Sequence, residues 1–138
     1  MPIVDISARA IKRGVIVEPA WYRINVISVG EKAAQPKEGK RPSTNYPVEA
    51  EIMFNGDTGD KAHEGVPLIW NLNSNFDSAI VDLLKVAVPD WTPEAGRVNL
   101  SVLEGKQIDV YVETGTWEGR LQNQVNHKYR VPRREVQG

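Results

Sequence analysis

The chain has 138 residues, a mass of 15.4 kDa and a net charge of -1, which fits one domain with terminal extensions rather than two full cores. Hydrophobic residues make up 41% and charged residues 25%, as in an ordinary globular domain, which excludes wholesale disorder, collagen-like repeats and coiled-coil rods. The chain has no cysteine and only two histidines, which excludes a disulfide framework, a thiolate zinc site and an all-histidine metal site.

The first part of the chain predicts an arm, one strand and a long loop. Residues 1–17 are weakly patterned, and we interpret them as an arm or an edge element. Residues 21–30 alternate between apolar and polar side chains, which is the period of a half-buried strand. Residues 31–47 are rich in lysine, proline, glycine and serine without apolar periodicity, which indicates a long flexible connection. The expected inward face of the strand consists of Tyr22, Ile24 and Val26.

Two further strands follow, separated by a glycine-rich loop. Residues 48–54 alternate clearly, and residues 66–73 form a shorter run with one apolar face. Trp70 shares that apolar face with its neighbours, so we expect it in the core. The expected inward residues of the first of these strands are Val48, Ala50, Ile52 and Phe54.

Residues 74–88 form the one convincing helix of the sequence. Their apolar side chains recur at helical spacing, Ser74 or Asn75 can cap the start, and Pro89 stops the helix. The predicted apolar stripe consists of Phe76, Ala79, Ile80, Leu83, Leu84 and Ala87.

The last part of the chain predicts a β-hairpin. Residues 106–115 alternate again between apolar and polar side chains. Residues 120–131 form a long strand in which polar positions separate Leu121, Val125 and Tyr129. The glycine-flanked segment between them, residues 115–119, supplies the turn.

The predicted order is therefore three strands, one helix and two strands. This mainly β pattern favours a five-stranded oligonucleotide-binding-fold barrel with one α-helix between strands 3 and 4. An open sheet with the helix packed across one face is the alternative. We assign residues 1–17 to an N-terminal arm, residues 18–132 to the barrel domain and residues 133–138 to a basic C-terminal tail.

Common catalytic signatures are absent from the sequence. It contains no glycine-rich phosphate loop, dinucleotide fingerprint, zinc-protease helix motif or nucleophile elbow. An acidic loop holds Asp57, Asp60, His63 and Glu64, but its spacing departs from that of a calcium loop, and we interpret it as solvated. We therefore expect no enzyme activity, no cofactor and no metal site.

Aromatic and basic residues give the remaining functional signal. Residues 1–48 and 119–138 are basic, with eight and five Lys or Arg against four and one acidic residues, whereas residues 49–118 carry four against thirteen. Basic ends that meet in space favour a polyanionic partner, and scattered surface charge is the alternative. Single-stranded nucleic acid is held by stacking rings and a cationic groove. We predict stacking by Trp117, Trp21 and Tyr111, and phosphate contacts by Arg23, Lys40, Arg41, Arg120, Lys128 and Arg130.

A resemblance to a known family rests on the segments EPAWYRINV, PLIWNLN and LEGKQIDVYVETGTWEGRLQNQVNHKYRVP. The last segment contains a Leu-x-Gly-Lys stretch, an aromatic residue and a glycine in the hairpin turn, and an asparagine before a basic strand that contains a tyrosine. These positions are Leu103, Gly105, Lys106, Trp117, Gly119, Asn123 and Tyr129. The pattern, over about residues 18–132, resembles small bacteriophage single-stranded DNA-binding proteins of the oligonucleotide-binding-fold type, several first described as domains of unknown function.

The resemblance implies a non-catalytic protein that coats single-stranded DNA with little sequence preference during phage DNA replication or recombination. It also implies a place in the host bacterial cytoplasm and, as partners, phage replication or recombination proteins. Because single-domain binders of this size often associate, and exposed strand edges permit it, further copies of the chain are also expected partners. Because the opening residues lack a signal peptide and no run is long enough to span a bilayer, we expect no membrane association. The alternative is a phage protein-interaction module for assembly or anti-defence, which the acidic middle of the chain favours.

Overall fold

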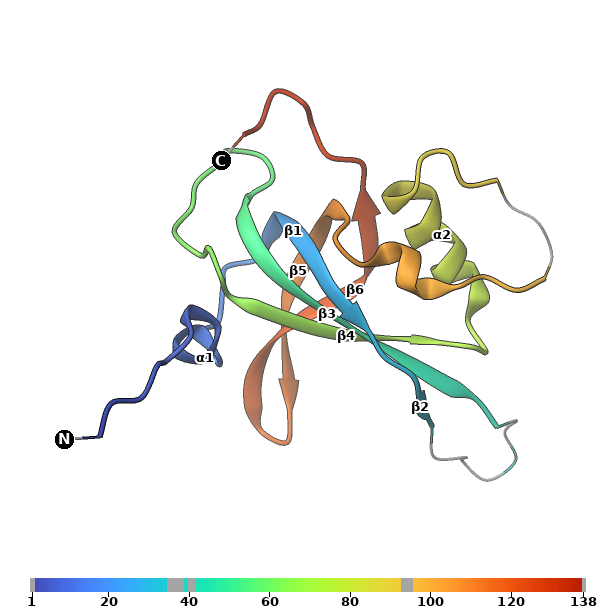
Figure 1. The fold of residues 1–138 in the computed structure, drawn as a ribbon, viewed down its shortest axis with the longest axis horizontal. Helices are drawn as coiled ribbons and strands as arrows, with labels where there is room; N and C mark the ends of the chain where they lie inside the picture. Colours follow the sequence, from blue (N-terminus) through green and yellow to red (C-terminus); the bar gives the residue numbers. More distant parts are fainter. Residues whose placement is uncertain (1, 35–38, 40–41, 93–95, 138) are drawn as a thin grey trace.

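The computed structural model describes residues 2–34, 39, 42–92 and 96–137. In this part of the chain, six antiparallel strands form one strongly curved sheet, with one α-helix in the N-terminal arm and another against one end of the sheet (Figure 1). The elements in chain order are α1 (Ala8–Lys12), β1 (Ala20–Val29), β2 (Lys32–Ala33), β3 (Thr44–Asn55), β4 (Pro67–Asn73), α2 (Asp77–Ala87), the 3-10 helix η1 (Leu100–Leu103), β5 (Gln107–Trp117) and β6 (Arg120–Arg130). None of the helices in these ranges is long and apolar enough to cross a membrane.

β1 lies at the centre of the sheet. It pairs with β3 on one side and with β5 on the other, β4 pairs with the far side of β3, and β6 pairs with the far side of β5. The two-residue strand β2 extends the β3 side of the sheet. The mainly β fold, the five predicted strands and the helix between the third and fourth of them are confirmed, and α1 and β2 are additional elements.

The predicted closure of the barrel is not seen, because no ladder joins the edge strands β4 and β6 in the described part of the chain. The two edges meet instead through side chains, where Trp70 Nε1 donates a hydrogen bond of 2.9 Å to the Tyr129 hydroxyl. Further along β6, Asn123 binds the backbone of the N-terminal arm at Val15 and Val17, so the arm rather than β4 lies against that part of the edge. The sheet therefore has an open seam between β4 and β6.

The core lies inside the curved sheet and under one face of α2. The inward residues predicted for the first strand are buried, and so is Trp70. α2 contributes Leu83, Leu84 and Ala87 to this core. The inward apolar side chains of the strands and those on the apolar stripe of α2 thus pack into one cluster, as expected from their spacing in the sequence.

Phe54 departs from its predicted position. Its neighbours Ala50 and Ile52 point into the core, but the register with β1 shifts between the pairs Arg23–Phe54 and Ile24–Ile52. This irregularity places one extra residue on β3, which reverses the alternation beyond it. Phe54 is consequently buried outside the core cluster, where the Arg23 guanidinium lies 5.0 Å from the centre of its ring.

The start of α2 also differs from the prediction. Phe76 is the N-cap residue and is 68% exposed, and neither Ser74 nor Asn75 caps the helix. Ser74 instead accepts a hydrogen bond from the backbone N–H of Thr44, so its hydroxyl holds the start of β3. Pro89 follows the C-cap residue Val88, as predicted, because proline cannot supply the backbone donor that a further turn needs.

The hydrogen bond across the seam gives the first prediction. Replacing Tyr129 with phenylalanine should lower the free energy of unfolding by about 1–3 kcal/mol, because the buried Trp70 N–H loses its acceptor. Urea unfolding followed by circular dichroism measures the change. Tyr46→Phe is the matched control, because the hydroxyl of Tyr46 has no hydrogen bond within the described residues. Equal losses in both variants would contradict a specific role for the seam bond.

Candidate nucleic-acid interface

The β5–β6 hairpin ends in a turn that presents two of the predicted site residues. Its two central residues, Glu118 and Gly119, both have positive φ, 50° and 77°, which is the conformation of a tight two-residue turn matched to the twist of the strands. Trp117 and Arg120 are the last register pair before this turn, so their side chains stand opposite each other. We call residues 117–120 the hairpin tip.

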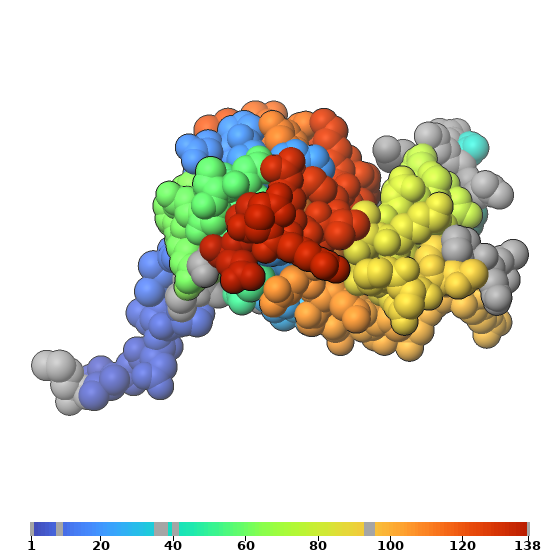
Figure 2. Space-filling view, turned by 90° about the horizontal axis from the view of Figure 1, so that it is seen from above, coloured from blue at the N-terminus to red at the C-terminus, as the bar shows by residue number. Residues whose placement is uncertain are grey.

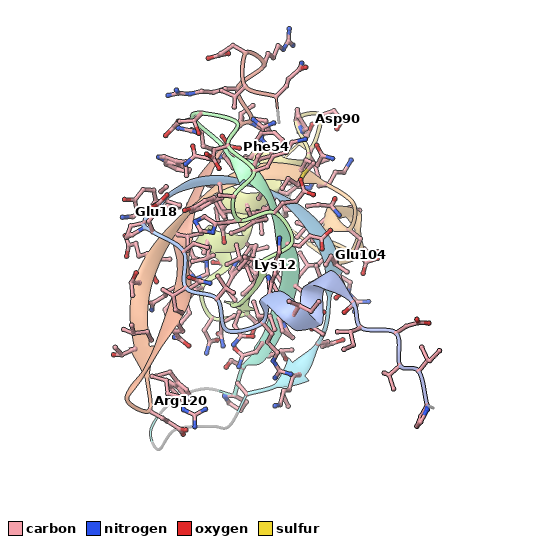
Figure 3. The ribbon with its side chains drawn as sticks, turned by 90° about the vertical axis from the view of Figure 1, so that its left-hand side faces the viewer. Lys12, Glu18, Phe54, Asp90, Glu104 and Arg120 are labelled. Carbon is pink, nitrogen blue, oxygen red and sulfur yellow. The ribbon has the colours of Figure 1, made fainter. Side chains whose placement is uncertain are left out.

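Both side chains of that pair are available at the hairpin tip. Trp117 is 67% exposed, and Arg120 is also exposed. Within the part of the chain that the structure describes, neither side chain forms a hydrogen bond, an ion pair or a ring contact. Figure 3 places Arg120 at the opposite end of the molecule from Phe54. The tip therefore offers one aromatic ring and one cation to an external partner.

Five of the other predicted site residues lie on the outer face of β1, β5 and β6. Trp21 and Tyr111 are half-buried and pack edge to face, with ring centres 5.5 Å apart. The Arg130 guanidinium lies 4.5 Å from the centre of the Trp21 ring, and Lys128 Nζ lies 5.4 Å from that of Tyr111. Both rings are already covered in part by protein cations, so their faces are less available than that of Trp117.

A buried carboxylate organises this outer face. Asp109 is fully buried and accepts from Arg23 Nε at 2.6 Å and from Arg130 Nη2 at 2.8 Å. Arg23 is itself buried and also donates to the Arg133 carbonyl at 3.2 Å. Gly56 packs directly above the carboxylate, and a Cβ atom at this position would lie 2.9 Å from Asp109 Oδ2. Arg23 is therefore held inside the protein rather than presented to a phosphate.

Arg130 is more accessible than Arg23 but is also neutralised. Its guanidinium binds Asp57 at 2.9 Å in addition to Asp109, and Arg133 lies 3.4 Å from the same Asp57 oxygen. Although partial burial opposes the charge, hydrogen bonds to Asp109 and Asp57 raise the pKa of Arg130. The acidic loop considered above as a metal site thus supplies a counter-charge. Within the described residues, no three metal-binding side chains come together.

Lys128 stands on an irregular stretch of β6. The register pairs Val110–Tyr129 and Val112–Val125 leave extra residues on β6, and His127 adopts a positive φ of 58°. There Lys128 Nζ binds Glu113 at 2.9 Å, and Asn126 donates to the other Glu113 oxygen at 2.7 Å. These hydrogen bonds lower the pKa of Glu113, and the bond to Glu113 raises the pKa of Lys128. Because both side chains are accessible, this pair is weak enough for an external anion to replace Glu113.

The structure thus divides the predicted residues into two sets. Trp117 and Arg120 form the hairpin tip, whereas five residues share the outer-face network. Those five are Trp21, Arg23, Tyr111, Lys128 and Arg130. Lys40 and Arg41 lie outside the described residues. Asp109, the residue that joins the network, was not identified from the sequence, and its only signal there is an acidic residue in an otherwise apolar stretch of strand.

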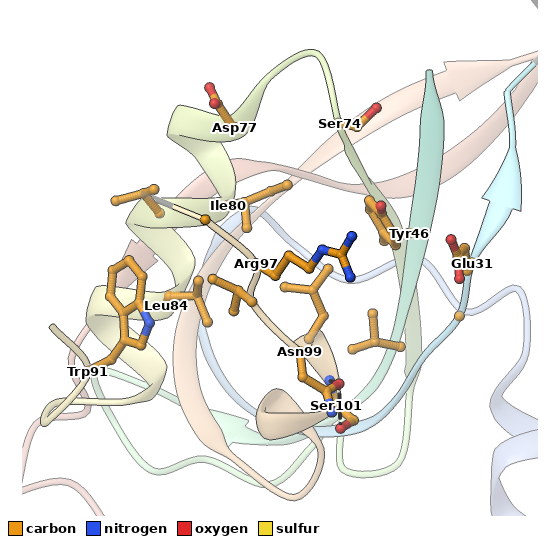
Figure 4. Close-up of a pocket in the computed structure, with 16 residues that line it drawn as sticks. Glu31, Tyr46, Ser74, Asp77, Ile80, Leu84, Trp91, Arg97, Asn99 and Ser101 are labelled. Atoms are coloured by element: carbon orange, nitrogen blue, oxygen red, sulfur yellow. Dashed lines mark hydrogen bonds between the residues drawn. The ribbon is translucent and has the colours of Figure 1, made fainter. Parts of the chain in front are cut away.

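A separate cleft of about 990 Å³ opens between α2 and residues 96–101 (Figure 4). Ile80 and Leu84 form part of its apolar wall, and Arg97 points into it toward Tyr46. Of the predicted site residues that the structure describes, none lines this cleft. It is therefore distinct from both the hairpin tip and the outer-face network.

No protein-family model matches the sequence, and no curated protein is significantly similar to it. The likeness to phage single-strand binders therefore rests on the short segments quoted above and stays a prediction.

The buried ion pairs give a prediction about stability. Asp109→Asn should lower the free energy of unfolding by about 3 kcal/mol or more, because Arg23 would remain buried without its counter-charge. Glu113→Gln, in the exposed pair with Lys128, serves as the matched control and should change stability little. Urea unfolding of both variants tests the difference. Similar stability of the two variants would show that Asp109 does not organise the outer face.

Proposed function

We propose that the protein binds single-stranded DNA without catalysis and with little sequence preference, using the hairpin tip as its primary contact. The observation that carries this proposal is the exposure of Trp117, at 67%, beside Arg120, a cation with no ion pair among the described residues. An exposed indole is a general stacking surface for bases, because every base has a π face, and a neighbouring guanidinium suits the phosphate that follows. Neither contact reads a base edge, which is why little sequence preference is expected.

Secondary cationic contacts would come from the outer face. The side chain of Lys128 is 57% exposed and Arg133 is 50% exposed, and each binds a carboxylate that a phosphate can replace. Arg23 is not included, because it is buried and held by Asp109. The DNA would then run from the hairpin tip along β6, and the number of phosphates neutralised would be small.

We also propose that the fold is an open form of the oligonucleotide-binding barrel. The strand order supports it, with β1 between β3 and β5, and with β4 and β6 as the two outer strands. The helix α2 lies between the third and fourth long strands along the chain, as this barrel requires. Trp70 and Tyr129 bring the two edges together where a closing ladder would run.

A protein-binding role is the second candidate, and the acidic surface of β3 favours it. Glu49 and Glu51 lie on the side of β3 opposite the core residues Val48, Ala50 and Ile52. Like charges on this face would repel DNA and would suit a basic protein partner.

Stacking by Trp117 is tested by its removal. Trp117→Ala should weaken binding of a fluorescein-labelled mixed-sequence single strand by about tenfold or more, measured by fluorescence anisotropy. Phe76→Ala is a matched control, because Phe76 is equally exposed, at 68%, but lies at the start of α2. Duplex of the same sequence should bind weakly. If the full chain binds neither DNA, or if both variants bind alike, the stacking role is wrong and the protein-binding candidate is favoured.

The phosphate contact is tested by salt dependence. Arg120→Gln should reduce the slope of log K against log salt concentration by about 0.7, since one fewer counterion is released from a single strand. Lys85→Gln removes an exposed cation from α2 and should leave the slope unchanged. The same anisotropy titration at several salt concentrations gives both slopes. An unchanged slope for Arg120→Gln would remove Arg120 from the interface.

A further inference from the structure

The N-terminal arm carries apolar side chains that the rest of its own chain does not cover. Residues 2–6 lead away from the body of the protein beyond α1, and the arm projects in both views (Figures 1 and 2). Ile3 is 90% exposed, Val4 77% and Ile6 66%. These three side chains flank Asp5 and expose apolar surface of the kind that marks interaction sites.

The same chain carries a groove with exposed apolar walls. This arm groove, of about 650 Å³, lies between arm residues 7–16, the start of β4 and the start of β6. Ile69 of β4 and Leu121 of β6 line it and are 58% and 61% exposed. Within the described residues, β4 pairs with no strand on its outer side, and an unpaired strand edge is a place where an extended segment can add.

The base of the arm is fixed to the body of the protein, so that residues 2–6 lie away from this groove. Asn123 Nδ2 donates to the Val15 carbonyl at 2.8 Å, and Asn123 Oδ1 accepts from the Val17 N–H at 2.9 Å. Lys12 at the end of α1 donates to the Glu64 carbonyl. The arm therefore already forms one wall of its own groove, and residues 2–6 leave it on the far side of α1.

Of the described residues that line the groove, one is acidic, Glu49, and one is basic, Arg13, and only the basic one suits the acidic arm. Asp5 is the only acidic residue before Glu18, and it lies among the exposed apolar residues of the arm. Arg13 lines the groove, is exposed and has no ion pair or hydrogen bond in the described part of the chain. An arm seated in the groove would cover Ile69 and Leu121 and bring Asp5 to Arg13.

We propose that two copies of this chain exchange arms, residues 2–6 of each docking in the arm groove of the other. Because each copy offers one arm and one groove, reciprocal docking about a two-fold axis closes the assembly at a dimer. The exchange uses neither Trp117 nor Arg120 and does not depend on DNA binding.

Light scattering after size exclusion tests the dimer. The full chain should elute with twice its monomer mass at high concentration and dissociate on dilution. Deletion of residues 2–6 and Leu121→Asp should each give a monomer with an unchanged circular dichroism spectrum, since these residues are exposed. Val102→Asp, which changes an exposed apolar residue on η1, is the matched control and should stay dimeric. A monomeric full chain, or a dimer that survives deletion of residues 2–6, would overturn the proposal.

The absence of cysteine allows a direct test of which segments meet. Under mild oxidation, a mixture of the Ile3→Cys and Leu121→Cys variants should form a disulfide-linked dimer in higher yield than a mixture of Ile3→Cys and Val102→Cys. Equal yields would overturn the exchange. A chain with both Ile3→Cys and Leu121→Cys that forms a disulfide within one monomer would show that each arm occupies its own groove, which also overturns it.

Discussion

A single buried carboxylate, Asp109, determines how the outer face of this protein is built. It binds Arg23 of β1 and Arg130 of β6, and thus ties the central strand to the edge strand. Arg23 in turn donates to the Arg133 carbonyl in the C-terminal residues. Removing any one of this set of three charged groups, Asp109, Arg23 and Arg130, would lower the free energy of unfolding, because a charge would stay inside the protein without its partner. The rings of Trp21 and Tyr111 are ordered beside this set. Figure 2 shows the C-terminal residues in red, lying against the loop that follows β3.

This arrangement divides the cations into those held in internal ion pairs and those that an external ligand can reach. The arginine that is most deeply buried has its charge satisfied internally, whereas Arg120 and Trp117 stand at a turn that has no core to pack against. Positive φ at both turn residues lets the hairpin close in two residues, which brings its last register pair out beyond the sheet. A ligand that needs a ring and a cation would meet them there first. The outer face then serves mainly to support the hairpin from its base.

The open seam between β4 and β6 is the second consequence of the fold. Within the described residues no ladder joins the two edges. The N-terminal arm lies against β6 at Asn123, and a hydrogen bond between Trp70 and Tyr129 links β4 to β6. Burial raises the pKa of Tyr129 far above its ordinary value, so its hydroxyl stays neutral and keeps its place in the seam. Proteins usually cover or block an unpaired strand edge, and here the arm lies beside only the start of β4 and the start of β6.

The amino-acid sequence by itself determined the five long strands, the helix α2 and its end at Pro89, because apolar periodicity and the chemistry of proline act over a few residues. It also determined the burial of Trp70, whose neighbours on the same face are apolar. Only the tertiary structure decided the position of Phe54, since one extra residue on β3 reverses the alternation. Only the tertiary structure decided which of the described cations are held in ion pairs. Arg23 and Asp109 are 86 positions apart, so their pairing depends on the strand order. Local patterns specify which face a side chain takes, whereas long-range pairing specifies what that side chain meets there.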